Sequence, residues 1–430
     1  MFNLQKKSGY VLCLVLMLAG CTVMAGAQQA LVIKPGARVA VVGDSITEQK
    51  LYSRFIEMYL LACRPDLHLH VMQYGWGGEA AGGFAYRMNN DLLPYKPDVV
   101  TTCYGMNDGG YRAYEPGIGK GYQSNMRNIV TGLKKTGALV IVGSPGAVDS
   151  KYFVRGNVEQ AAKVYNDSLA HLRDLAKTVA DENGMPFANV HDALIDAMAK
   201  AKAAYGDDYA VCGYDGVHPP ADGHLVMAYA FLKAMGFDGN LGLITVNMNG
   251  EATASEGHTI LSANAGKVEL ESSRYPFCFF GGEKDASGTR SMLPYVPFNQ
   301  DLNRLTLVVK GLDTEQGKVT WDTTSKVFPR AELEKGINLA AEFLDNPFVP
   351  AFRKVEGAVI KKEAFETTMI KGIINPLWNV VNASNHDPVI APIAAMPIRQ
   401  HYDELYEKLH QEVVAQIVPV KHTLVIEGVK

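Results

Sequence analysis

Length, composition and charge set the first limits on this chain. It has 430 residues, of which 47% are hydrophobic and 20% charged, and its formal net charge is -4 with no long block of one sign. This composition is ordinary for a soluble globular protein and argues against a large nucleic-acid-binding surface. The length exceeds what one hydrophobic core usually organises, so we expect one large domain with additional units.

The N-terminus has the pattern of an export signal, which we assign to residues 1–27. Lys6 and Lys7 precede an apolar run, from Val11 to Ala19, that is too short to span a bilayer, and small residues follow it. No other stretch is long and apolar enough for a transmembrane helix. We therefore expect an exported protein, either periplasmic or secreted.

Two processing routes fit this signal. The segment Leu18-Ala19-Gly20-Cys21 resembles a bacterial lipobox, in which case residues 1–20 would be removed and Cys21 would carry a lipid anchor to the outer membrane. Ala25-Gly26-Ala27 suits ordinary cleavage before Gln28. We favour the second route slightly.

Two of the six cysteines lie in the export signal, and the other four are far apart in the sequence. No C-x-x-C pair is present, so a zinc site is not expected. An oxidising compartment permits a disulfide, but the sequence assigns no pairing. We favour small buried side chains at all four positions, which are Cys63, Cys103, Cys212 and Cys278.

Residues 28–238 alternate between strand and helix patterns and form the predicted catalytic domain. Apolar runs that stop at turn residues predict strands at 39–42, 67–74, 98–104, 138–142 and 186–190. Apolar residues at helical spacing predict helices at 51–63, 122–133, 157–182, 191–204 and 222–235. This alternation indicates an α/β fold with a doubly wound parallel sheet.

From Gly239 onward the pattern changes to short alternating segments separated by glycine-containing turns. These predict an antiparallel β-sandwich over 239–335, with the strand-like residues 418–430 rejoining it. Residues 336–417 have a helical pattern and form an insertion or a strut. The aromatic segment 275–300, rich in Gly and Pro, is either a functional loop or an irregular cover of a sheet edge.

Polar residues follow the strand ends of the first domain. Ser45 comes after Gly43-Asp44 at the end of the first strand, and Asn107 follows the third strand. His218 lies in a loop directly before a helix. Ligands of open α/β sheets bind beyond the carboxyl ends of the strands, so we expect these side chains to lie close together. The alternative for Gly-Asp-Ser alone is a helix-capping turn.

Acyl transfer by serine needs a nucleophile, a base, a group that orients the base, and donors for the oxyanion. Ser45 supplies the hydroxyl and His218 the imidazole, while Asp215, three residues earlier, is placed to orient the ring. The N–H groups of Ser45 and Gly78 and the amide of Asn107 are the predicted oxyanion donors. Two further acids, Asp44 and Asp108, are expected to fix the loops by accepting backbone N–H bonds.

Four segments in order resemble the sequence blocks of the SGNH, or GDSL-type, hydrolases: Gly43-Asp44-Ser45-Ile46, Gly78, Gly105-Met106-Asn107-Asp108, and Asp215-Gly216-Val217-His218-Pro219. The resemblance covers residues 31–238. It implies a flavodoxin-like fold, esterase activity without metal or other cofactor, and the roles given above for Ser45, Gly78, Asn107, Asp215 and His218. One departure is Gln73, which stands where the second block commonly has Asn, so support for that loop is in question.

Other enzyme classes fit less well. The α/β-hydrolase motif G-x-S-x-G is incomplete, because Thr47 occupies the position of its second glycine. No H-E-x-x-H segment is present to suggest a metallohydrolase. A dinucleotide fingerprint at Gly75-x-Gly77 fails at Ala80, where the third glycine would be required.

The most favoured substrate is an acylated carbohydrate, from which the enzyme would remove O-acetyl groups through an acyl-enzyme. The alternatives are a lipid or general short-chain carboxylester hydrolase, or a carbohydrate-binding module on the same scaffold. His224 is expected to pack rather than react. Four residues next to the site loops either line an acyl pocket or sugar platform or belong to the core: Trp76, Tyr104, Met106 and Tyr111. The sequence does not determine the oligomeric state.

Overall fold

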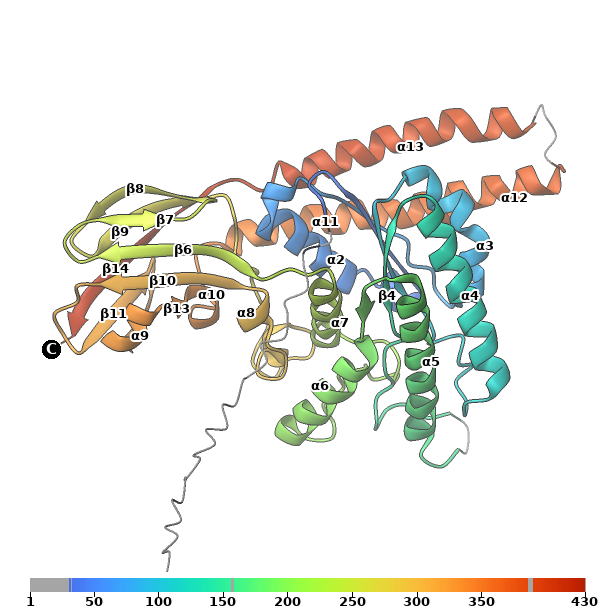
Figure 1. The fold of residues 1–430 in the computed structure, drawn as a ribbon, viewed down its shortest axis with the longest axis horizontal. Helices are drawn as coiled ribbons and strands as arrows, with labels where there is room; N and C mark the ends of the chain where they lie inside the picture. Colours follow the sequence, from blue (N-terminus) through green and yellow to red (C-terminus); the bar gives the residue numbers. More distant parts are fainter. Residues whose placement is uncertain (1–30, 32, 156–157, 386–389, 430) are drawn as a thin grey trace, which may run out of the picture.

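The computed structural model describes residues 31, 33–155, 158–385 and 390–429 of the chain. Figure 1 shows an elongated molecule, with an α/β domain at one end and two further sheets at the other. The predicted signal peptide and Cys21 lie outside the described residues. Within the described ranges, no helix has both the length and the apolar character needed to cross a membrane.

The first sheet has five parallel strands, in the order β2-β1-β3-β4-β5. This is the flavodoxin-like strand order, so the predicted fold class is confirmed. The strands are β1 (Arg38–Gly43), β2 (His70–Gln73), β3 (Val99–Cys103), β4 (Leu139–Gly143) and β5 (Phe187–Ala188).

Helices cover both faces of this sheet: α2 (Tyr52–Met58, continued by a π-helical turn over Tyr59–Cys63), α3 (Ala81–Asp91), α4 (Pro116–Lys135), α5 (Ala161–Asn183), α6 (Val190–Tyr205) and α7 (Ala221–Ala234). Alternate residues of β1 serve the two faces, because successive side chains of a strand point in opposite directions. Val39 and Val41 pack in one apolar cluster, and Ala40 and Val42 in another. Helix α3 was not predicted, because Gly82 weakens the helical pattern in its first turn.

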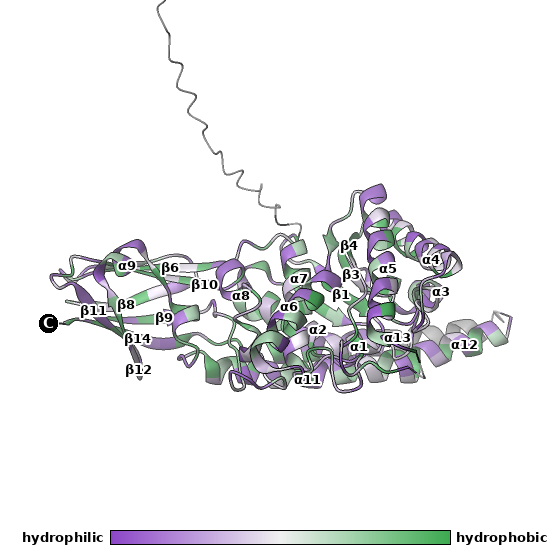
Figure 2. Cartoon of the chain, turned by 90° about the horizontal axis from the view of Figure 1, so that it is seen from below, coloured by the Kyte–Doolittle hydropathy of each residue, from purple (hydrophilic) through white to green (hydrophobic). Residues whose placement is uncertain are grey.

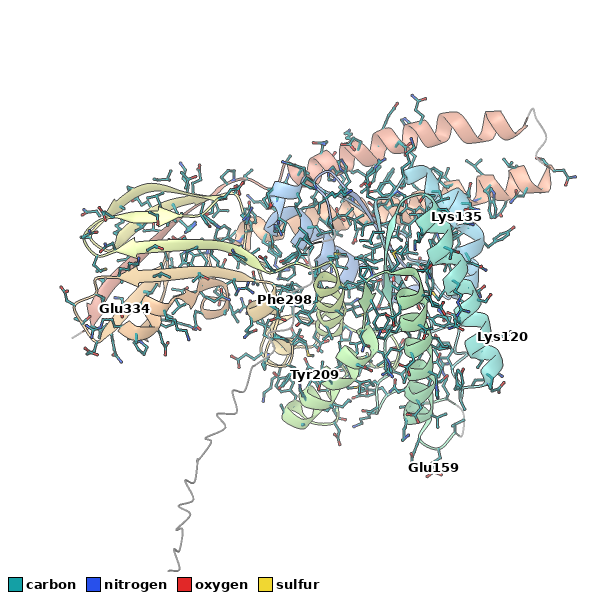
Figure 3. All side chains as sticks on the ribbon, viewed as in Figure 1. Lys120, Lys135, Glu159, Tyr209, Phe298 and Glu334 are labelled. Atoms are coloured by element: carbon teal, nitrogen blue, oxygen red, sulfur yellow. The ribbon has the colours of Figure 1, made fainter. Side chains whose placement is uncertain are left out.

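The register brings the strand ends to one level. Gly43 pairs with Cys103, and Cys103 pairs with Gly143, so β1, β3 and β4 end side by side. Helix α4 starts beyond this edge and runs back along the sheet, with Lys120 near its first turn and Lys135 at its end (Figure 3). The residues that follow β1 and β3 therefore share one edge of the sheet.

The second half of the chain forms two smaller sheets with a shared apolar core. One has the order β13-β10-β6-β7 and the other β12-β11-β14-β9-β8. Their strands are β6 (Asn240–Asn247), β7 (Ala252–Ala254), β8 (His258–Asn264), β9 (Lys267–Ser272), β10 (Arg304–Lys310), β11 (Gln316–Trp321), β12 (Thr324–Pro329), β13 (Ile337–Asn338) and β14 (Val420–Val429). Short helices α8 (Phe298–Asp301), α9 (Arg330–Lys335) and α10 (Leu339–Glu342) flank them.

Strand β14 pairs with β9 and β11, so the end of the chain rejoins the earlier strands, as its pattern predicted. One pairing differs from the expected antiparallel arrangement: β6 and β10 run parallel. A parallel pair needs a long crossover, and here the residues from 248 to 303 provide it, including β7, β8 and β9.

The aromatic segment 275–300 joins the two ends of the molecule as packed core. Phe277 contacts Phe55 of α2, Phe298 of α8 and Phe352 of a C-terminal helix, at ring-centroid distances of 6.2, 5.0 and 5.1 Å. Phe298 lies between the α/β domain and the sheets (Figure 3). Cys278 in this segment is buried and free, as are Cys63, Cys103 and Cys212. Structural packing therefore accounts for the buried aromatic residues of this segment.

The C-terminal helices cover the edge of the parallel sheet that is formed by β2. Helix α11 (Val349–Met369) continues through a π-helical turn, Ile370–Ile374, into α12 (Asn375–Ala383) along one side of the molecule (Figure 2). Helix α13 (Ile390–Val414) runs alongside them (Figure 1). Strand β2 is the edge strand, and its Val71 carbonyl accepts hydrogen bonds from Lys362 Nζ (2.6 Å) and the Tyr406 hydroxyl (3.0 Å). These helices thereby satisfy backbone groups that an open edge would leave unpaired.

A chain of buried hydrogen bonds links the two smaller sheets. The indole N–H of Trp321 donates to Nδ1 of His422 (3.1 Å), so Nε2–H of this histidine donates to Ser272 Oγ (2.9 Å). The Ser272 hydroxyl then donates to Nδ1 of His258 (2.8 Å), whose Nε2–H donates to the Leu241 carbonyl (2.9 Å). Both histidines are neutral in this arrangement, and burial lowers the pKa of His422 to about 3.

We predict that His422→Gln reduces the acid sensitivity of folding. The unfolded chain protonates His422 near its ordinary pKa of about 6.5, whereas the folded protein does so only near pH 3, so stability falls as the pH drops. Between pH 7 and pH 5 this histidine should account for a loss of about 2 kcal/mol in the free energy of unfolding. Urea denaturation of both proteins at the two pH values measures it, and an identical pH dependence would contradict the assignment.

Candidate active site

Ser45 lies in the first turn of the short helix α1 (Ser45–Glu48), directly beyond β1. The approach of α1 to the sheet requires glycine at position 43, because a Cβ there would lie 2.0 Å from Thr47 Oγ1 and 2.9 Å from the Cys103 carbonyl oxygen. Asp44, and not Ser45, caps the helix, since its carboxylate accepts the N–H of Ile46 at 3.0 Å. The Ser45 hydroxyl is therefore free of the capping role.

A tight loop before α7 places Asp215 and His218. Its backbone turns at Gly213 and Gly216, which have φ angles of +85° and +78°. A Cβ at Gly216 would lie 2.4 Å from backbone atoms of Phe153, so the loop packs too closely for a larger residue. Asp215 Oδ1 accepts the N–H groups of Val217 and His218, both at 2.9 Å, and this fixes the carboxylate within its own turn.

His218 bridges the other two residues. Its Nδ1 lies 2.6 Å from Asp215 Oδ2, and its Nε2 lies 2.8 Å from Ser45 Oγ. Partial burial opposes ionisation of Asp215, but hydrogen bonds from His218 and Val217 outweigh it and hold the pKa of the carboxyl below its usual value. An ionised carboxylate only accepts hydrogen bonds, so Nδ1 carries the proton and Nε2 is left to accept from the Ser45 hydroxyl.

The three side chains are open to solvent. Exposed fractions are 55% for the Asp215 side chain and 33% for the His218 side chain, and Ser45 is partly exposed. A substrate can therefore reach the hydroxyl from the surface.

Among the described residues, two N–H groups of the loop after β2 have no acceptor, those of Gly78 and Ala80. The N–H of Gly75 donates to Gln73 Oε1 (2.9 Å), that of Trp76 to the Gly43 carbonyl (3.0 Å), and that of Gly77 to Glu48 Oε2. The N–H of Glu79 donates to the Trp76 carbonyl at 3.1 Å. The N–H of Gly78, the donor that the block alignment predicted, is therefore available to a ligand, as is that of Ala80.

The side-chain amide of Asn107 also has one N–H that no described residue accepts. Its Nδ2 donates one hydrogen to the Glu79 carbonyl (3.0 Å), and its Oδ1 accepts from the Tyr111 hydroxyl (2.9 Å). These two bonds fix the amide orientation, and the second hydrogen on Nδ2 remains for a ligand. Ser45 N–H is also free, because it begins α1 and no described residue accepts from it.

The two acids predicted as loop supports make backbone contacts. Asp108 accepts the N–H of Ala81 at 3.1 Å, which joins the loop after β3 to the start of α3. Asp44 is buried beneath α1. Burial raises the pKa of Asp44 to about 7 and that of Asp108 to about 6, and the mutual repulsion of nearby carboxylates adds to the effect.

Two residues of the site region, Glu79 and Arg87, were not predicted from sequence. Arg87 of α3 forms two hydrogen bonds to the Glu79 carboxylate, at 2.7 and 2.8 Å, and Tyr104 donates to the same group at 2.8 Å. This buried pair holds Glu79, whose carbonyl orients Asn107. The only signal for Glu79 in the sequence is its position directly after a glycine-rich turn. This pattern is too common to assign a role to the residue.

The remaining candidates divide between core and surface. Tyr104 and Met106 are buried, so they belong to the core, whereas Trp76 and Tyr111 are partly exposed. His224 is buried, accepts the N–H of Tyr52 at Nδ1 (3.1 Å) and pairs with Gln49, and burial lowers its pKa to about 3. It therefore packs, as predicted.

Within the described ranges, no three His, Cys, Asp or Glu side chains gather as a metal site.

Comparisons with known proteins address the same domain. Residues 41–226 match the GDSL-like Lipase/Acylhydrolase family. An acetylxylan esterase of Geobacillus stearothermophilus is 25% identical over 228 residues, which cover 48% of this chain and 97% of that protein. The match of residues 41–226 agrees with the resemblance of the four sequence blocks to the SGNH/GDSL hydrolases, and it supports esterase or acylhydrolase activity for this domain.

Solved structures are similar to different extents. The structure of BT4096, described as a gut microbial diltiazem-metabolizing enzyme, covers 94% of this chain and all of its own, with a TM-score of 0.70 and 23% identity. The fold of both halves of the chain therefore occurs in a solved protein. The acetylxylan esterase Axe2 from Geobacillus stearothermophilus covers 48% of this chain and 96% of its own, with a TM-score of 0.40 and 22% identity.

Proposed function

We propose that this protein is an exported serine esterase that removes O-acetyl groups from polysaccharides or oligosaccharides. The observation that carries the proposal is the imidazole of His218, which lies within hydrogen-bond distance of both Ser45 Oγ and Asp215 Oδ2. Ester hydrolysis follows from the family, and the serine mechanism and the carbohydrate substrate are the parts proposed here.

In this mechanism Ser45 Oγ attacks the acetyl carbonyl carbon while His218 Nε2 takes the hydroxyl proton. Asp215 holds the ring and stabilises the imidazolium that forms. The negative charge develops on the former carbonyl oxygen, where Ser45 N–H, Gly78 N–H and Asn107 Nδ2–H would donate. These donors are oriented before substrate arrives, so they add little reorganisation cost.

Collapse of this intermediate breaks the ester bond to the sugar oxygen. His218 returns its proton to that oxygen, and the sugar leaves as an alcohol, while Ser45 keeps the acetyl group. A water molecule then attacks the acetyl-enzyme, with His218 again taking a proton. Acetate is released, and the Ser45 hydroxyl regains its proton.

Two features support a carbohydrate substrate. The relative from Geobacillus stearothermophilus is named an acetylxylan esterase. Aromatic side chains also lie in the open around the site: Tyr214, directly before Asp215, is 73% exposed, and Tyr111 is partly exposed beside Asn107. Such rings provide apolar faces with a polar tip, which suits a sugar ring.

The test is acetate release from a panel of esters by the wild-type protein. Acetylated xylan and xylo-oligosaccharides should give a higher kcat/KM than p-nitrophenyl acetate, and long-chain triglycerides should give none. A preference for triglycerides would support the lipid alternative. Hydrolysis of p-nitrophenyl acetate or diltiazem alone would support a general small-ester hydrolase. Binding of acetylated xylan without acetate release would support a carbohydrate-binding module.

Export belongs to the same proposal and rests on the lysine-flanked apolar run at the N-terminus. Expression in a Gram-negative host followed by N-terminal sequencing of the periplasmic and extracellular protein tests it. A mature chain that begins at Gln28 is expected. A lipidated chain that begins at Cys21 would support the anchored form, and recovery only from the cytoplasm would overturn export.

A further inference from the structure

The loop that carries Gly78 is held by a side chain from the C-terminal helices. Lys371, in the π-helical turn after α11, donates to Glu48 Oε1 at 2.6 Å. The other oxygen of this carboxylate accepts the N–H of Gly77, next to Gly78. The Lys371 ammonium also lies 5.0 Å from the centre of the Trp76 ring. One cation thereby contacts both the carboxylate and the aromatic residue that position this loop.

A second contact reaches the start of the same loop. Gln73 Oε1 accepts the N–H of Gly75 (2.9 Å), and its Nε2 donates to the hydroxyl of Thr367 in α11. The fit is close, because a Cβ at Gly75 would lie 2.3 Å from the backbone nitrogen of Glu48. Gln73 is buried, and turning its amide over would set Nε2–H against the donating N–H of Gly75, so these contacts fix one amide orientation. Gln73 stands where the second sequence block commonly has Asn, and its longer side chain has a hydrogen-bond partner, Thr367, on α11.

Helix α11 itself is fixed against the sheet. Lys362 is fully buried and pairs with Glu57 of α2 (2.9 Å) and with Glu366 (2.6 Å). Burial opposes its charge, but the two carboxylates outweigh this and raise the pKa of Lys362. Glu366 also accepts the N–H of Gln73 at 3.0 Å. Lys362 is the cation shared by the two carboxylates, so a displacement of α11 that withdrew it would leave both buried without a counter-charge.

We infer that α11 and its π-helical turn form a positioning element for the oxyanion-binding loop, with Lys371 and Gln73 as positioning residues. This inference rests on the proposed function. Neither side chain donates to the oxyanion. They act through Glu48 and the loop backbone, which aim the N–H of Gly78. π-Helical turns often occur at functional sites, and here the turn places Lys371 within reach of Glu48.

The test is Lys371→Met, assayed with p-nitrophenyl acetate. We expect kcat to fall about tenfold with KM unchanged, because the loop loosens while its donor remains, and loss of a donor itself costs about 10² to 10³. The matched control is Lys361→Met, since Lys361 in the same helix pairs with Glu412 at the surface. This control should keep wild-type kcat. Lys371→Arg should restore most of the activity, and Thr367→Val should show a loss of the same kind through Gln73.

A second readout separates positioning from general damage. A boronic acid that forms a tetrahedral adduct with serine should bind Lys371→Met about tenfold more weakly, matching the fall in kcat, while the melting temperature and the pH profile stay those of wild type. Equal kcat and boronate affinity in Lys371→Met and Lys361→Met would overturn the inference. Loss of activity with a raised KM, a lowered melting temperature and no rescue by arginine would also overturn it.

The proposed function fails separately. Full activity in Ser45→Ala would remove the serine mechanism, whatever Lys371→Met does. If Ser45→Ala is inactive and Lys371→Met is indistinguishable from its control, the mechanism stands and only the positioning role is lost.

Discussion

Ser45→Ala should abolish hydrolysis of p-nitrophenyl acetate, with a loss of at least about 10⁴ in kcat. The reason is that no other hydroxyl lies within hydrogen-bond distance of His218 among the described residues, so no second nucleophile can replace it. The remaining oxyanion donors would still bind substrate, but no acyl-enzyme could form.

The fold of this variant should be intact. Ser45 is partly exposed, its hydroxyl bonds only to His218, and Asp44 provides the cap of α1. The melting temperature should therefore match that of wild type. Ser325→Ala is the matched control, because Ser325 is exposed on β12 and pairs only with Thr320. Turnover by Ser45→Ala at the rate of this control would refute the mechanism.

Asp215→Asn should have the second largest effect, a loss of about 10⁴ in kcat. Oδ1 of Asp215 accepts two backbone N–H groups, and an asparagine keeps these bonds only by turning its oxygen toward them. Its NH₂ group then faces Nδ1 of His218, which must accept. The ring proton moves to Nε2, and the base can no longer take the Ser45 proton.

This effect is distinguishable from misfolding. The asparagine preserves the turn, so the melting temperature should change little, and KM should stay near its wild-type value. Asp313→Asn, at an exposed position in the turn before β11, is the control and should be fully active. Wild-type kcat in Asp215→Asn would show that the carboxylate does not set the tautomer.

Much of the catalytic domain could be predicted because its signals are local. Each of the five strands is an apolar run that stops at a turn, and the order of the four blocks gave the flavodoxin-like sheet. The contacts of Asp215 and His218 were predictable for the same reason, since both residues sit in one turn. Helix α3 was missed where Gly82 and Gly83 hide the periodicity.

Contacts between distant positions could not be predicted. Gln73 and Thr367, or Glu48 and Lys371, are separated by about 300 residues of sequence, and no pattern in either segment indicates the pairing. The parallel pairing of β6 with β10 is similar, because alternation predicts a strand and its faces but not the direction of its neighbour. The sequence departure at Gln73 raised the question, and only the structure supplies its partner on α11.

Reaction of the wild-type protein with a fluorophosphonate, followed by peptide mass spectrometry, tests the central claim most directly. A fluorophosphonate reacts with a serine hydroxyl whose proton is taken by a neighbouring base. Ser45 is such a candidate, because its Oγ lies within hydrogen-bond distance of His218 Nε2. The expected result is a single phosphonylated peptide that contains Ser45, loss of esterase activity in proportion to labelling, and no labelling in Ser45→Ala. Labelling of a different residue, or full inactivation without modification of Ser45, would contradict it.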